Sequence, residues 1–173
     1  MTRVDLLVDD RAWMRLPVLP ASAEDDRTAV AAAVSRGLGE DQVRAALELR
    51  RPGAQFELLL QEPGLAAPTV VHAWVGAVDG LGGDDLEAMV RPLGPTLVEP
   101  EVQAYELEGR RAARAVWALH GALADGTAAT AWSLAVALEG GVAIFVSEPS
   151  APATTTALIA RGDALAASLE LVA

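Results

Sequence analysis

The segment from Thr127 to Leu138 alternates large and small side chains with a period of two residues. On one side fall Thr130, Trp132, Leu134, Val136 and Leu138, and on the other fall Ala129, Ala131, Ser133, Ala135 and Ala137. This alternation is typical of a β-strand, because successive side chains of a strand point to opposite faces. A helix would place Trp132 and Leu134 about 200° apart and scatter the large residues. The pattern therefore predicts a strand, in spite of the helix propensity of alanine.

Glycine-containing turns on both sides of this strand predict an antiparallel meander. Asp125-Gly126 suits a two-residue hairpin turn, and Gly140-Gly141 supplies a second turn. The three strands are expected at residues 112–122, 128–138 and 142–146. Because both faces of the middle strand are apolar, we expect helices or further strands to cover the sheet on both sides.

Periodic apolar residues and capping signals predict helices before and after the meander. They span residues 23–36, 40–50, 84–93 and about 150–169. Ser22 and Asp25 form an imperfect capping box for the first helix. Ser150 or Thr154 is expected to cap the last one, with a proline allowed in its first turn. In that helix Gly162 belongs to the packing stripe and permits close contact with the sheet.

The remaining strands are predicted at residues 4–8, 55–61 and 69–78, and "WMRLPVLP" is expected to run extended because of its prolines. Gly109 is either a hairpin point between two strands or a bulge in one long strand. The sequence thus predicts a single α+β domain over residues 1–173. Its architecture is an antiparallel β-sheet covered by helices, similar to an α/β/α sandwich.

Composition and charge exclude several classes of function. Of the 173 residues, 52% are hydrophobic and 21% are charged, which is sufficient for a core. The net charge of −11 disfavours nucleic acid and anionic membranes as partners. Cysteine is absent, so disulfides, thiol catalysis and thiolate metal sites are excluded. No apolar stretch reaches the length of a membrane-spanning helix or a signal segment, and we expect a cytoplasmic protein.

The two histidines are the first candidates for chemistry. His72 and His120 both fall in predicted strands, near Trp74 and Trp117. A metal or general-base site would need the two histidines adjacent to each other, with a carboxylate such as Asp125 or Glu139 nearby, and the chain has no HxH, HExxH or GxSxG spacing. We therefore expect structural or surface histidines, with no catalytic residue, no metal and no cofactor.

Five residues are candidates for contacts with a partner. The cluster "GRRAAR" carries Arg110, Arg111 and Arg114, which either protect a sheet edge from aggregation or form a docking patch for an acidic partner, a carboxylate or a phosphate. Four of the seven aromatic residues are tryptophans. Trp13 and Trp74 are either core residues or exposed binding anchors.

The segment from residue 99 to residue 172 resembles a known structural group. It comprises the strand "EGRRAARAVW", a hairpin, "GVAIFVSEP" and a helix followed by "SLEL". This order resembles the Mog1/PsbP-like α/β/α sandwich group, and the N-terminal third matches that group less well. The resemblance implies a scaffold used mostly for protein contacts, and it assigns a role to no individual residue.

Three functional hypotheses follow from these observations. The first is a noncatalytic domain that binds another protein, as an adaptor or a chaperone-like accessory protein. The second is a binder of a small apolar ligand held between the sheet and a helix. The third is a hydrolase-type enzyme that uses His72 or His120 with a carboxylate. An exposed strand edge would also allow a homodimer.

Overall fold

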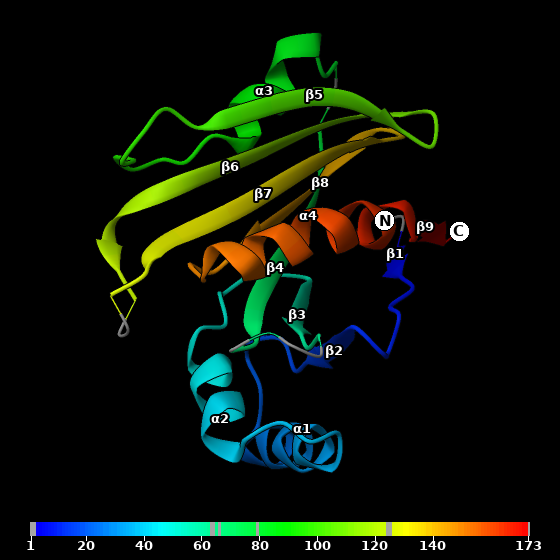
Figure 1. The fold of residues 1–173 in the computed structure, drawn as a ribbon. Helices are drawn as coiled ribbons and strands as arrows, with labels where there is room; N and C mark the ends of the chain where they lie inside the picture. The colour runs from blue at the N-terminus through cyan, green and yellow to red at the C-terminus, as the bar shows by residue number, and fades with distance from the viewer. Residues whose placement is uncertain (1–2, 63–64, 66, 79, 124–125, 173) are drawn as a thin grey trace.

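The computed structural model describes the whole chain except residues 1–2, 63–64, 66, 79, 124–125 and 173. Seven strands form one antiparallel sheet in the order β2-β3-β4-β8-β7-β6-β5, and β1 pairs with β9 in a second, two-stranded sheet (Figure 1). The strands of the large sheet are Trp13–Leu16 (β2), Phe56–Leu60 (β3), Thr69–Ala77 (β4), Glu101–Leu107 (β5), Arg110–Ala122 (β6), Ala128–Leu138 (β7) and Gly141–Ser147 (β8). The small sheet consists of Arg3–Leu6 (β1) and Leu169–Val172 (β9). The predicted α+β class and antiparallel sheet are confirmed.

Four helices cover the two faces of the large sheet within the described residues. They are Ala23–Ser35 (α1), Glu40–Glu48 (α2), Gly83–Val90 (α3) and Pro152–Ala167 (α4). Helix α4 packs on one face, and α1, α2 and α3 pack on the other (Figure 1). None of these helices has the length and apolar character needed to cross a membrane.

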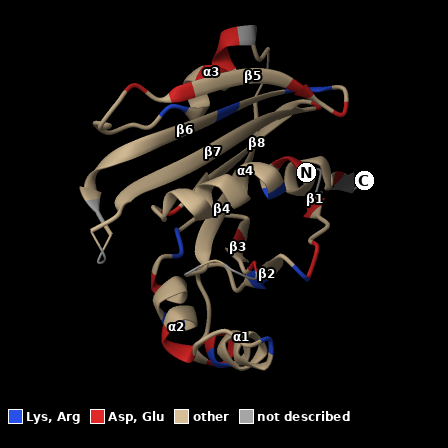
Figure 2. Ribbon diagram, in the orientation of Figure 1, with Lys and Arg blue, Asp and Glu red and all other residues tan. Residues whose placement is uncertain are grey.

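The alternation of large and small side chains in β7 determines which helix covers which face. Trp132 and Leu134 lie in the same buried cluster as Leu158 and Leu165 of α4. The alanine side of β7 faces α3, where Ser133 donates a hydrogen bond to the backbone carbonyl of Val90 (2.6 Å). Small side chains let α3 approach the sheet closely, and neither β7 nor β8 carries a charged residue (Figure 2).

The ends of the last helix differ from the prediction. Its N-cap is Ala151, not Ser150 or Thr154, and Pro152 occupies the first turn. Ser150 is unavailable as a cap because its backbone forms a β-bridge with Thr130 of β7. After α4 ends at Ala167, the chain continues into β9, a strand that the sequence patterns did not indicate.

Gly109 lies in a hairpin between β5 and β6, which settles the alternative left open by the sequence. Glu108 and Gly109 have φ values of 48° and 78°. Two successive positive φ angles match the turn type that suits the twist of paired strands, and glycine adopts such angles without strain. Of the two predicted glycine turns beside β7, the one at Gly140-Gly141 joins β7 to β8, with a φ of 69° at Gly140. The other includes Asp125, which lies outside the described residues.

Helix α4 rests directly on the central strand at Gly162. A Cβ atom added to Gly162 would lie 2.3 Å from Cζ2 of Trp132, far inside van der Waals contact. Both residues are buried, so the indole ring has no room to move away without disturbing the core. The close approach of helix and sheet therefore depends on the absence of a side chain at this position.

The substitution Gly162→Ala is expected to destabilise the protein by about 1–3 kcal/mol because of overpacking against Trp132. In an unconstrained helix the same change would stabilise by about 1 kcal/mol, so the sign of the effect is diagnostic. Urea unfolding measures it. In a Trp132→Leu background the penalty of Gly162→Ala should disappear, and an equal penalty in both backgrounds would contradict this packing account.

Candidate functional site

The middle of the sheet face opposite α4 forms an open groove, which we call the sheet groove. Helices α1 and α2 pack over β2, β3 and β4 at one end of this face, and α3 packs over β5, β6 and β7 at the other. Between them lies a pocket of about 400 Å³. Its apolar lining includes Trp74, Trp117, Leu119, Ala131 and Val146, and its polar end includes Arg51, His72 and Glu148.

Sheet register explains why these residues meet. His72 lies opposite Val146, Val146 lies opposite Ser133, and Trp117 lies opposite Ala131 in successive strand pairs. Residues two positions apart on one strand share a face, so Trp74 joins His72 on the same side of β4. Their ring centroids are 5.8 Å apart. Both side chains line the groove.

A chain of hydrogen bonds between charged groups closes one end of the groove, buried at Glu57 and His72 and exposed at Arg51. His72 Nδ1 lies 2.6 Å from Glu57 Oε2, and His72 Nε2 lies 3.0 Å from Glu148 Oε1. Arg51 donates two hydrogen bonds to the same oxygen of Glu148, at 2.7 and 3.0 Å. Its backbone N–H donates to Glu57 Oε1 (2.7 Å). Two cations and two carboxylates thus balance one another when His72 is protonated.

The hydrogen bonds determine the protonation state of this cluster. Burial by itself lowers the pKa of His72, but the hydrogen bonds to Glu148 and Glu57 outweigh burial, and the pKa of His72 is raised above its ordinary value. The hydrogen bond to His72 lowers the pKa of Glu148, in spite of partial burial and with further help from Arg51. The cluster therefore favours an imidazolium between two carboxylates.

This arrangement gives no support to histidine catalysis. Both ring nitrogens of His72 are engaged by carboxylates, so neither is free to accept a proton from a substrate. His120 is exposed at the far end of β6, and Asp125 lies outside the described residues. Within the described part of the chain, no group of three His, Cys, Asp or Glu side chains is placed to hold a metal ion.

The sequence patterns missed the carboxylate partners of His72. Glu57 is fully buried within the apolar run "FELLL", directly opposite His72 in the pairing of β3 with β4. A buried glutamate in such a run is a signal that could have been noticed, since charged residues are rarely buried without a partner. Glu148 and Arg51 are distant in sequence from His72, and only the folded chain brings them together.

The segment that connects α3 to β5 runs beside β6 next to the sheet groove. Its residues Leu97 and Val98 are 53% and 61% exposed. Thr96 forms a β-bridge with Leu119 of the groove lining, and the backbone N–H of Leu97 donates to the carbonyl of Ala118 (2.9 Å). Leu97 therefore lies opposite Ala118, on the face of α4, whereas Val98 returns to the face of Leu119. We call Val98 the groove rim.

The three arginines of "GRRAAR" lie on different faces of β6. Arg110 donates hydrogen bonds to carbonyls at the end of α4, which include those of Ala166 and Ala167. Arg114, on the same face, contacts Gln103, Tyr105 and Asp163. Arg111 is exposed on the opposite face and donates to the carbonyl of Leu81. The fold does not gather them into one basic patch, although Arg111 stays accessible.

The two candidate tryptophans lie in different environments. Trp13 is 2% exposed and belongs to the core beneath α4. Trp74 is partly exposed and lines the sheet groove. Of the five residues proposed for partner contacts, Trp74 is thus the one placed in the groove.

Comparisons with known proteins identify the fold. The chain matches no protein-family model, and no curated protein matches its sequence. It is similar to the crystal structure of LpqN, involved in cell envelope biogenesis of Mycobacterium tuberculosis, with a TM-score of 0.55 and 14% identity over 100% of this chain and 85% of LpqN. The solution structure of cyanobacterial PsbP (CyanoP) from Synechocystis aligns with a TM-score of 0.49 and 11% identity over 97% and 86% of the two chains.

The fold is therefore that of the Mog1/PsbP-like group, as the C-terminal residues predicted. Because the alignment with LpqN covers the whole chain, the likeness also includes the N-terminal part, where the sequence resemblance was weaker. At this level of identity the likeness concerns the fold alone.

The pKa shifts of the buried cluster predict how stability depends on pH. Since the pKa of His72 is raised, its contribution is fully present below the ordinary value of 6.5 and is lost as the pH rises through the folded-state pKa. Since the pKa of Glu148 is lowered, its contribution is present above 4.5 and is lost in acid. We expect the free energy of unfolding to fall on the alkaline side of 6.5, as measured by urea unfolding across pH.

Two variants test whether His72 causes this loss of stability at alkaline pH. His72→Gln should remove the alkaline loss of stability, because glutamine does not titrate, whereas His120→Gln should retain it because His120 is exposed. A difference in unfolding free energy between the wild type and His72→Gln that stays constant with pH would contradict the protonated cluster.

Proposed function

We propose that this protein is a noncatalytic protein-binding domain whose sheet groove receives apolar side chains of a partner protein. The observation that supports this proposal is the open middle of an apolar sheet face, walled by Trp74 and Trp117 and continued outward by the exposed Val98. An adaptor or a chaperone-like accessory protein would use such a surface to hold a client segment.

The composition of the groove favours a protein partner. Tryptophan side chains in a depression, surrounded by aliphatic residues, are typical of the centre of a protein interface. The exposed rim residue Val98 lies outside the pocket lining. It adds contact area that a small ligand inside the pocket would not cover. A partner segment that spans both the groove and the rim would bury all of these side chains.

The ionic cluster at the end of the groove holds the shape of the groove wall and is not expected to recognise charge on a partner. Glu57, His72 and Glu148 satisfy one another, and Arg51 completes the balance. A partner therefore needs no charge of its own to enter this end of the groove, and the buried hydrogen bonds hold the wall in one arrangement.

The remaining expectations about the protein's surroundings stay predictions. They are a cytoplasmic location, the lack of nucleic-acid and membrane partners, and a homodimer through a strand edge. LpqN is described as involved in cell envelope biogenesis, which makes the envelope the alternative location. Fractionation of the source cells distinguishes the two locations.

Affinity purification from the source cells, with quantitative comparison of variants, tests the proposed function. Val98→Asp places a charge on the groove rim, and Leu97→Asp is its matched control, because both side chains are exposed (61% and 53%) and lie on opposite sides of the same segment. We expect a partner that is retained by the wild type and by Leu97→Asp, and lost at least roughly tenfold with Val98→Asp and with Trp74→Ala.

Two outcomes would overturn this proposal. One is capture of the same proteins by the wild type and all three variants, because partner binding would then bypass the groove. The other is the absence of any captured protein together with an apolar metabolite that copurifies with the wild type and not with Trp74→Ala. That result would instead assign the groove to a small ligand.

A further inference from the structure

Strand β5 leaves one edge of the large sheet open. It is the last strand in the order, so β6 pairs with only one of its two sides (Figure 1). The two-residue hairpin turn places Leu107 opposite Arg110, and residues that flank such a turn form a hydrogen-bonded pair. Since these pairs alternate along an antiparallel ladder, Val102, Ala104 and Glu106 direct their backbone N–H and C=O groups away from β6.

These outward backbone groups are available to a further strand. Among the described residues, none outside β5 forms a hydrogen bond with the outward groups of Val102, Ala104 or Glu106. Ala104 and its neighbour Gln103 are both exposed, so no other element covers the middle of the strand. A row of free donors and acceptors on an exposed strand is a template for pairing with another chain.

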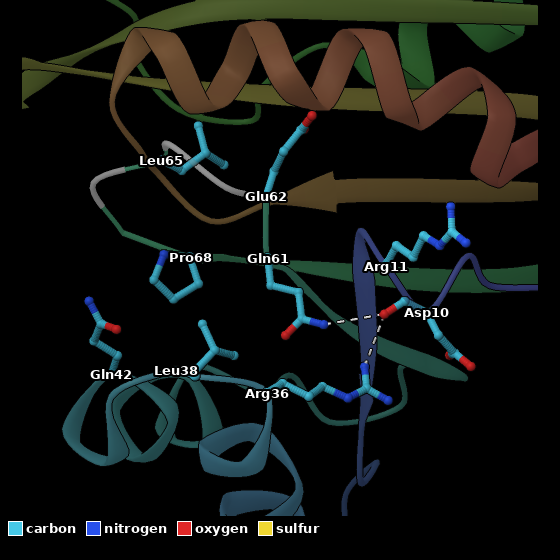
Figure 3. Close-up of a pocket in the computed structure, with 10 residues that line it drawn as sticks. Asp10, Arg11, Arg36, Leu38, Gln42, Gln61, Glu62, Leu65 and Pro68 are labelled. Carbon is cyan, nitrogen blue, oxygen red and sulfur yellow. Dashed lines mark hydrogen bonds between the residues drawn. The ribbon is translucent and has the colours of Figure 1, made fainter.

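The opposite edge of the same sheet is closed. Strand β2 has four residues, and Pro17 follows it directly. Arg36 donates to the carbonyl of Trp13 within this strand and to the carbonyl of Asp10 just before it (3.4 and 3.3 Å; Figure 3). A short strand, a proline and a covering side chain all block an edge, whereas β5 has seven residues and no proline.

The open edge is also an electrically balanced part of an acidic protein. Residues 101–116, which form β5, its hairpin and half of β6, contain three glutamates and three arginines, so their net charge is zero, against −11 for the whole chain. The arginines lie on β6, one strand inward, so they balance the glutamates without covering the edge. An acidic chain repels a second copy of itself overall, and this edge adds nothing to that repulsion.

The edge of β5 is self-complementary about Ala104. When two copies of β5 run antiparallel with Ala104 opposite its own counterpart, the other pairs are Val102 with Glu106, Gln103 with Tyr105 and Glu101 with Leu107. All seven residues of the strand are then paired, the outward groups of the two copies meet, and no two like charges are opposed. The smallest side chain of the strand lies at the centre of the contact.

We propose that two copies of this protein form a dimer through β5, in the antiparallel register centred on Ala104, so that the two large sheets become one. The pairs that involve Val102, Ala104 and Glu106 each exchange two backbone hydrogen bonds. The same seven residues supply both sides of the contact, as in an isologous two-fold interface. Because the two-fold axis is perpendicular to the sheet, both sheet grooves open on the same face of the dimer.

Sedimentation velocity of the full chain over roughly 1 to 500 µM tests the dimer. We expect a reversible shift from the 17.9 kDa of one chain to twice this mass. Ala104→Pro removes the outward N–H at the centre of the contact, and Ala104→Lys opposes two like charges there. Each should raise the dimer dissociation constant at least roughly tenfold. Ala128→Lys makes the same change at an exposed alanine of β7 and should dimerise like the wild type.

Single cysteines test the register, because the chain has no cysteine of its own. Opposed residues of a hydrogen-bonded pair have Cα atoms about 5.5 Å apart, within the range of a disulfide. Ala104→Cys should therefore give a disulfide-linked dimer under mild oxidation. Gln103→Cys is the matched control, because Gln103 is also exposed and lies diagonal to its own counterpart, about 7–8 Å away, which is too far for a disulfide.

Several results would overturn the proposal. They are a monomer at every concentration, a dimer that neither Ala104→Pro nor Ala104→Lys weakens, and equal cross-linking of Ala104→Cys and Gln103→Cys. A monomer that captures another protein, and loses it with Ala104→Lys, would assign the edge to a foreign strand instead. Trp74→Ala, which tests the sheet groove, should dimerise like the wild type. Failure of the partner-binding proposal is thereby distinguishable from failure of this one.

Discussion

The contact between Trp132 and Gly162 determines how the layers of this protein are arranged. All large side chains of β7 point to one face, and α4 can cover them closely because Gly162 has no Cβ that would meet the indole ring. The opposite face of the same strand carries alanines and a serine, so the short helix α3 can lie almost on the backbone there. A sheet whose two faces are both apolar must be packed against other elements on both sides. The side chains of β7 determine how closely α3 and α4 approach the sheet.

The helices on the alanine side of the sheet leave its middle uncovered, and we expect the binding function to reside there. Helices α1 and α2 pack over one end of that face and α3 over the other, which leaves the middle open as the sheet groove. His72 lies at the polar end of this groove, where Glu57 and Glu148 hold it on both ring nitrogens. A buried ion cluster of this kind contributes little net stability compared with a hydrophobic replacement, yet removing one member leaves an unpaired buried charge. Its value to the protein is therefore a fixed arrangement of the groove wall.

The sheet groove is lined mainly by strand residues whose backbone groups are paired in the sheet. The apolar recognition proposed for this groove therefore depends on side chains, foremost Trp74 and Trp117, and not on free backbone groups.

Local patterns in the sequence determined the elements of this fold, because periodicity, turns and caps depend on neighbouring residues. They predicted the two-faced strand β7, a hairpin at Gly109 as one of two alternatives, the capping of α1 by Ser22 and the small residue where α4 meets the sheet. Tertiary structure alone decided that β9 returns to β1 and that His72 meets Glu57, Glu148 and Arg51. Those outcomes depend on strand order and register between segments far apart in the chain, which no local periodicity encodes.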